Sequence, residues 1–188
     1  MSNEKLKGDF ELFRDHCIEI RHQYNVYVNL FNEDSEPVLS KVAATFFTEI
    51  ASMMHRDWKL QVCKIMDAAE MYGKENITID LINKQLIDVG LMESKITSLT
   101  SDLKSFGAKV KPARNKRIAH YDRLSQINGS DLGGTTEKEL ESFLVNLQEY
   151  CDGVGNLVGL GPLDFSGSGC AGDELDLLKC LREYCKNA

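Results

Sequence analysis

The residues best suited to chemistry in this 188-residue sequence lie in one short stretch, Lys111 to Arg123, which includes His120. Between Ser101 and Arg123 there are seven basic and two acidic residues, a balance of +5, whereas the whole chain carries −7 and the remainder therefore −12. Guanidinium groups bind phosphate through paired hydrogen bonds, and an imidazole with a pKa of ~6.5 exchanges protons near neutral pH. The stretch is therefore the expected binding place of an anion, and phosphate chemistry is what its residues could do.

The spacing within this stretch sets a geometric condition on that chemistry. Pro112 suits the first turn of a helix and disfavours helical conformation at Lys111, so we expect a break or kink there; one way to form it is a new helix that starts at Pro112. Arg114 and Asn115 would then lie in its first turn, where free N–H groups and the helix dipole favour a phosphate. His120 follows Arg114 by six positions, ~120° round a helix and ~9 Å along its axis. The two side chains reach one phosphate only if the arginine bends round or a second chain closes the site.

The run Arg114-Asn-Lys-Arg-Ile-Ala-His120 resembles the R-[N/D/H]-x4-H motif of the HEPN superfamily of small helical domains. With the following Tyr-Asp it is similar to the abortive-infection U-type (AbiU2-like) branch, and Trp58 to Asp67 also resembles a block of that branch. The resemblance covers about Leu6 to Val158. It implies a metal-independent endoribonuclease that acts as a homodimer, with its two motifs facing one cleft.

Carried over by position, the resemblance gives catalytic roles to three residues. Arg114 would hold the scissile phosphate, Asn115 would position or polarise it, and His120 would be the acid or base when the RNA 2′-OH attacks. The expected RNA-binding residues are the basic and aromatic neighbours Lys111, Lys116, Arg117, Tyr121 and Arg123. The implied partners are RNA, a second copy of the chain and an antitoxin protein, in phage defence or a toxin–antitoxin pair. Because RNA supplies its own nucleophile, we expect no metal and no cofactor.

Two other interpretations stay open. Many HEPN proteins have lost activity, so the domain could instead be a non-catalytic module that holds a nucleotide, RNA or a protein partner. It could also be a structural helical scaffold, which would not bind RNA even at low salt, where phosphate contacts are strongest. In either case His120 and Tyr121 would serve the packing of helices, and Asp122 would be an ion-pair partner.

The elements that must position this stretch are helical. Apolar residues from Leu6 to Phe31 step alternately by four and three, which predicts one long helix over about 4–31. A second pattern, with Pro37 in its first turn, predicts a helix to about Tyr72, either as one helix or with a kink at His55-Arg-Asp57. After a turn at residues 72–76, Thr78 is expected to cap a short helix that ends near residue 89.

Two further long helices are predicted. From Met92 to Val110 the apolar residues again step by four and three, and Thr136 with Glu139 forms a capping box at the start of a helix that runs to Val158. We therefore expect an all-α fold, a bundle of about four long helices plus short helices, which is HEPN-like by the resemblance. The bundle domain is predicted to span residues 1–160, and residues 161–188 a flexible linker and a C-terminal amphipathic helix.

Composition indicates the cellular compartment in which the protein is expected. The sequence lacks an apolar run of about 18 residues, and its first residues lack the apolar core of a signal peptide. The six cysteines form no C-x-x-C pair and have no histidine at ligand spacing, which argues against zinc and favours free thiols. We expect a cytoplasmic protein that does not bind membranes.

Overall fold

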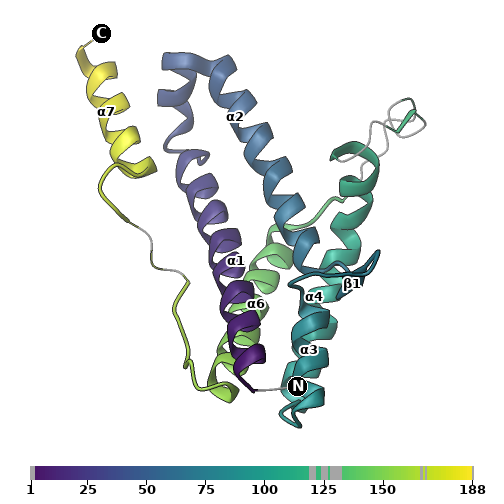
Figure 1. The fold of residues 1–188 in the computed structure, drawn as a ribbon. Helices are drawn as coiled ribbons and strands as arrows, with labels where there is room; N and C mark the ends of the chain where they lie inside the picture. The colour runs from purple at the N-terminus through teal and green to yellow at the C-terminus, as the bar shows by residue number, and fades with distance from the viewer. Residues whose placement is uncertain are drawn as a thin grey trace. The chain divides into compact units, whose positions relative to one another are not determined.

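The computed structural model (Figure 1) describes residues 3–118, 122–123, 127, 133–165, 167 and 169–187, and for Arg117 the backbone alone. Over these residues the chain is almost entirely helical, which confirms the predicted all-α fold. The four long helices are α1 (Asn3–Leu30), α2 (Glu36–Ile65), α4 (Ser94–Ala113) and α6 (Glu137–Leu157). The shorter ones are α3 (Ile79–Asp88) and α7 (Glu174–Asn187). No helix in the described ranges is long and apolar enough to cross a membrane.

A small hairpin lies between α2 and α3. Strand β1 (Glu70–Met71) pairs antiparallel with β2 (Lys74–Glu75), and both turn residues, Tyr72 and Gly73, have positive φ angles of 54° and 75°. The sequence predicted this turn but not the two strands. It also predicted that α2 would reach Tyr72, which is wrong because the helix ends at Ile65.

The chain divides into two compact units. The first comprises Met1–Ile18 and Lys59–Asp164, and the second Glu19–Trp58 and Phe165–Ala188. Helices α1 and α2 therefore each contribute residues to both units. The predicted domain boundary near residue 160 stays a prediction.

The core of the first unit is built on large apolar side chains. The ring of Phe13 on α1 meets that of Tyr150 on α6 edge to face, with 5.8 Å between the ring centroids. Phe106 on α4 stacks on Phe143 of α6, with 4.3 Å between centroids. All four rings are buried, and burial of each such side chain stabilises the fold by roughly 1.5–3 kcal/mol. Helices α4 and α6 are therefore held firmly against each other.

Three polar side chains in this unit form a chain of hydrogen bonds between helices. The Tyr150 hydroxyl donates to Asn83 Oδ1 at 3.0 Å, and Asn83 Nδ2 donates to Thr100 Oγ1 at 2.9 Å. Burial raises the pKa of Tyr150 well above its usual value, so the hydroxyl keeps its proton and acts as a donor. These hydrogen bonds connect α6 to α3 and α3 to α4. The predicted caps are confirmed as well, since Thr78 accepts from the Leu81 N–H and Thr136 forms the capping box with Glu139.

The second unit has a smaller core. Leu30, Leu39 and Leu178 are buried there, and partly buried apolar residues pack around them: Val26, Phe31, Phe47, Met54 and Leu181. Leu178 and Leu181 belong to α7, so the amphipathic C-terminal helix docks on the end of α1 and the start of α2. Asn29 Nδ2 strengthens this docking by donating to Glu174 Oε1 at 2.7 Å.

Helix α2 is irregular within the second unit. Ala43 has φ −161° and ψ 65°, which is not helical, so the helix bends there. The kink predicted near His55 is wrong, because the helix is regular at that position. Between Leu39 and Trp58 this part of α2 has no buried residue, although it is rich in apolar side chains. Apolar surface is thus left uncovered on this helix.

Candidate functional site

The predicted helix break at Pro112 does not occur. Helix α4 runs through the proline to Ala113, and a π-helix, η1 (Arg114–Ile118), follows directly. Val110 and Ala113 are buried, so core packing holds the backbone helical on both sides of the ring. Pro112 lacks the backbone N–H that would donate to Ala108 O in a regular helix.

This correction removes one argument for phosphate binding. The backbone N–H of Arg114 donates to the carbonyls of Lys111 and Val110, so it is not a free donor at the start of a helix. Any anion at this position must therefore be held by side chains. A π turn is nevertheless a frequent feature of functional sites, because it turns side chains out of the regular helical register.

The Arg114 side chain is fixed in place by two neighbours. Its Nη2 lies 3.1 Å from Asp67 Oδ2, and its Nη1 donates to Asn115 Oδ1 at 3.1 Å. The side chains of Arg114 and Asp67 are 28% and 19% exposed, so the ion pair is partly shielded from water. A guanidinium has five N–H donors, and two are used in these contacts. The remaining donors can bind an anion without moving the arginine.

Asp67 ends the Trp58 to Asp67 block named in the sequence analysis, but no role at the site was predicted for it. It lies in the turn after α2, and its backbone N–H donates to Lys64 O at 3.3 Å. The sequence placed it inside a helix that was expected to reach Tyr72. A usable signal was present, because Asp67 is a single acid among Met66, Ala68 and Ala69 at the end of an apolar pattern.

A pocket of about 180 Å³ adjoins this ion pair. It is lined by Cys63, Met66, Asp67, Lys104, Gly107, Ala108 and Lys111. At Gly107 a Cβ atom would lie 2.7 Å from Met66 Cγ, so glycine allows α4 to approach the end of α2. Burial raises the pKa of the Cys63 thiol, although the positive charge of Arg114 opposes the shift. Cys63 is therefore protonated at neutral pH and is not a nucleophile.

Positive charge in the basic stretch is unevenly compensated. Lys104 forms an ion pair with Asp80 on α3, Lys109 with Glu139 on α6, and Arg114 with Asp67. Lys111 and Lys116 are exposed and form no ion pair among the described residues. The uncompensated charge therefore lies around the end of α4 and η1, beside Arg114.

The structure places part of the predicted site. Arg114 and Asn115 are brought together on η1, Lys116 is exposed on the same element, and Lys111 is exposed in the last turn of α4. Arg123 is also exposed. His120, Tyr121 and the side chain of Arg117 lie outside the described residues, so their predicted roles stay predictions.

Comparison with known proteins gives one match. A family model described as AbiU2, of HEPN type, matches residues 3–167. The matched region includes α1 to α6 and ends before α7. No curated protein and no solved structure matches the chain.

Proposed function

Because this chain belongs to the AbiU2 family of HEPN domains, we propose that it is a metal-independent endoribonuclease in which Arg114 binds the scissile phosphate of RNA. One observation carries the proposal: a partly shielded guanidinium, held by Asp67 and Asn115, stands where positive charge is uncompensated. Such a group stabilises charge that builds on a phosphate during cleavage. The HEPN module itself is established by the family match, and the nuclease activity is the proposal.

The proposed reaction needs only the RNA and this chain. The 2′-oxygen forms a bond to phosphorus while the bond to the 5′-oxygen breaks, which leaves a 2′,3′-cyclic phosphate and a 5′-hydroxyl. His120 takes the 2′-OH proton or gives a proton to the leaving oxygen, and such help is worth ~100 to 10,000-fold in rate. Arg114 neutralises the phosphate oxygens, and Asn115 positions or polarises them.

Asp67 has a positioning role in this scheme. Its carboxylate binds one edge of the guanidinium, so Arg114 presents its other donors in a fixed direction. A fixed arginine loses less conformational entropy when it binds RNA than a mobile one. Lys111, Lys116, Arg117, Tyr121 and Arg123 would hold the flanking RNA through phosphate contacts and stacking.

A homodimer is part of the proposal. The resemblance to HEPN domains implies that the motifs of two chains face one cleft. A second copy would bring a further motif to the same cleft, so that one imidazole acts as base and the other as acid. By the resemblance, the setting is phage defence or a toxin–antitoxin pair in the cytoplasm, with an antitoxin as protein partner.

Cleavage of a labelled RNA in the presence of a chelator tests the proposal. We expect products that end in cyclic phosphate, and loss of at least ~100-fold in rate for Arg114→Ala and for His120→Ala. Arg114→Lys keeps the charge but loses the planar fork, so we expect it to recover little activity. Lys95→Ala is the matched control, because Lys95 pairs with Glu149 on α6, away from the motif in the sequence. Full cleavage by both motif variants would reject these assignments.

The alternative is a non-catalytic module that binds RNA, a nucleotide or a protein. The contact between Arg114 and Asp67 supports this alternative, because the carboxylate offsets the positive charge that an anion would otherwise meet. This interpretation predicts a mobility shift of RNA at low salt, weakened by Arg114→Ala, with no new RNA ends. Growth arrest on expression, abolished by Arg114→Ala, would instead agree with a toxic nuclease.

A further inference from the structure

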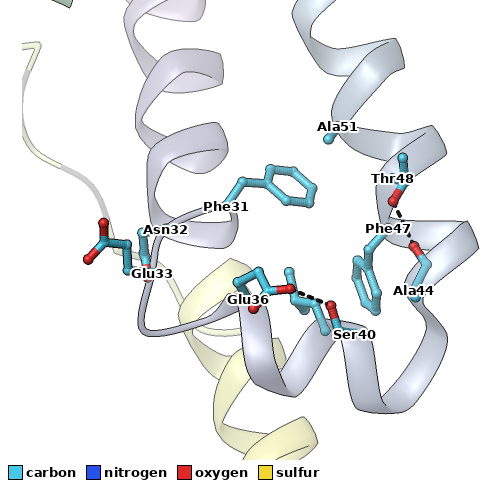
Figure 2. A pocket seen from close by; sticks show the side chains of 10 residues that line it. Phe31, Asn32, Glu33, Glu36, Ser40, Ala44, Phe47, Thr48 and Ala51 are labelled. Carbon is cyan, nitrogen blue, oxygen red and sulfur yellow. Dashed lines mark hydrogen bonds between the residues drawn. The ribbon is translucent and has the colours of Figure 1, made fainter.

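An open groove lies in the second unit, far along the sequence from the HEPN motif. It has a volume of about 460 Å³ and is lined by residues from Phe31 at the end of α1 to Ala51 on α2. Figure 2 shows Phe31 and Phe47 projecting into the same space from the two helices. Leu39 is the third large apolar residue of the lining. The volume lies within the range of ~300–1,000 Å³ that is typical of ligand sites.

Beside Phe47, part of the wall that α2 gives to this groove consists of small side chains. Ala44, Thr48 and Ala51 line it at spacings of four and three residues, along one face of the helix (Figure 2). The Thr48 hydroxyl is turned back onto Ala44 O at 2.9 Å, so it presents its methyl group rather than a free donor. A face of small residues lets another helix approach closely, with larger side chains of that helix inserted beside it.

Charge at the groove has one sign. Glu33 and Glu36 line it, Asp34 lies between them in the chain, and none of the three forms an ion pair among the described residues. Glu36 accepts only from the Ser40 hydroxyl, at 2.7 Å. From Phe31 to Ala51 there are four acids and one base, Lys41, a balance of −3. This field repels RNA and anionic lipid, and it opposes the approach of a second, equally acidic copy.

Further apolar surface lies on the same helix. Phe46 is 56% exposed and Met53 49% exposed, within the part of α2 that has no buried residue. At 100° per residue these two side chains lie on the face of α2 opposite Ala44, Thr48 and Ala51, so they are not part of the groove. An acidic rim selects a partner whose charge is positive.

We propose that this groove docks a cationic amphipathic helix of a partner protein. Apolar side chains of that helix would fill the space between Phe31 and Phe47, and its lysines or arginines would meet Glu33 and Glu36. This binding is separate from RNA cleavage, because the groove residues belong to the second unit and Arg114 to the first.

Model peptides test the groove directly. The probe is a fluorescent peptide of about 14 residues, four helical turns, with leucines on one face and lysines on the other. We expect fluorescence anisotropy to show saturable binding. A peptide with glutamates in place of lysines, and one with the same composition but leucines scattered round the helix, should bind at least tenfold more weakly. Equal binding of either comparison peptide, or absence of binding by the first, would overturn the proposal.

Paired variants separate the groove from general acidity. Glu33→Gln with Glu36→Gln should weaken peptide binding roughly tenfold, whereas Glu19→Gln with Glu183→Gln removes the same charge from exposed positions of the same unit that do not line the groove. Equal effects of the two pairs would reject the site.

A substitution that fills the groove tests the site without changing its charge. Ala51→Phe should block the peptide without altering charge, and Ala171→Phe, at an exposed position of the same unit, should not. RNA cleavage should be unchanged in all these variants. If Ala51→Phe instead abolishes a dimer measured by light scattering, the occupant is a second copy and the proposed cationic partner is wrong.

Discussion

Helices α2 and α4 each depart from regular α geometry at one place, for opposite reasons. Helix α2 bends at Ala43, where there is no proline or glycine, whereas α4 continues through Pro112 into a π turn. The residues beside Pro112 include buried Val110 and Ala113, and those beside Ala43 are exposed or half-buried. Packing on the core, more than the residue at the irregular position, therefore decides whether an irregularity becomes a bend.

The two helices also present two different kinds of site. The firmly packed helix end presents a fixed guanidinium, held by a carboxylate from a neighbouring element. The loosely packed helix presents an apolar groove with an acidic rim. A site that stabilises charge needs side chains that are fixed in place. A docking surface can function with side chains that move when a partner binds.

The largest expected contrast is in side-chain packing. Phe143→Ala removes the ring that stacks on Phe106 of α4 and should lower the free energy of unfolding by about 3–5 kcal/mol. Phe46→Ala, on the exposed part of α2, should change it by less than ~0.5 kcal/mol. Urea unfolding of the two variants measures both values. Similar losses would contradict the view that α4 is supported by the core and this part of α2 is not.

The prolines within α4 and α2, Pro112 and Pro37, give the next contrast. Pro112→Ala restores an N–H donor within α4 and removes a ring clash, so the free energy of unfolding should rise by about 1–2 kcal/mol. Pro37→Ala lies in the first turn of α2, where proline fits, and should lower it by about 0.4–1 kcal/mol because the unfolded chain gains freedom.

Activity of the same variants sharpens this test. If the proline imposes the π turn, Pro112→Ala should also slow RNA cleavage by turning Arg114 away from Asp67. A loss of stability in Pro112→Ala would show that the core accommodates the proline without strain.

A smaller effect is expected at the ion pair that fixes Arg114. Asp67→Asn keeps the shape but removes the charge, and should cost about 1 kcal/mol of stability and slow RNA cleavage through a mobile arginine. Asp80→Asn breaks the more exposed pair with Lys104 and should cost less than ~0.5 kcal/mol, with cleavage unchanged. Equal cleavage by both variants would remove Asp67 from the site.

The smallest effect concerns acid stability at the start of α6. The side-chain bond from Lys109 lowers the pKa of Glu139 from 4.5 to about 2. The unfolded chain therefore binds more protons between these values, so this contribution is present above pH ~4.5 and is lost as the pH falls towards ~2. Acid titration of stability should show a weaker dependence in this window for Glu139→Gln than for the wild type. An identical dependence would argue against the Lys109 contact.

Features of the fold that depend on local sequence were predictable. Thr78 and Thr136 cap their helices through hydrogen bonds that span three residues, and the four-three stepping of apolar residues in α1 marks its buried face from Leu6 to Ile20. Arg114 and Asn115 could be named because their motif is contiguous in the chain.

The other features depend on which surfaces meet. Nothing near Ala43 marks a bend, since the bend follows from missing core contacts. The charged run at His55 suggested a kink, yet the helix is regular there, and the Arg56 side chain donates from Nε to Ser52 O at 3.2 Å. Asp67 meets Arg114 from 47 positions away, a pairing that no local pattern encodes.

The crossing of α1 and α2 between the two units has a consequence for how the chain folds as it is made. The first unit needs Lys59–Asp164 to cover its N-terminal helical segment, and the second needs Phe165–Ala188 to cover Glu19–Trp58. Neither unit can be completed before its later segment has left the ribosome. Parts of α1 and α2 therefore wait for the residues that cover them until those segments have been made.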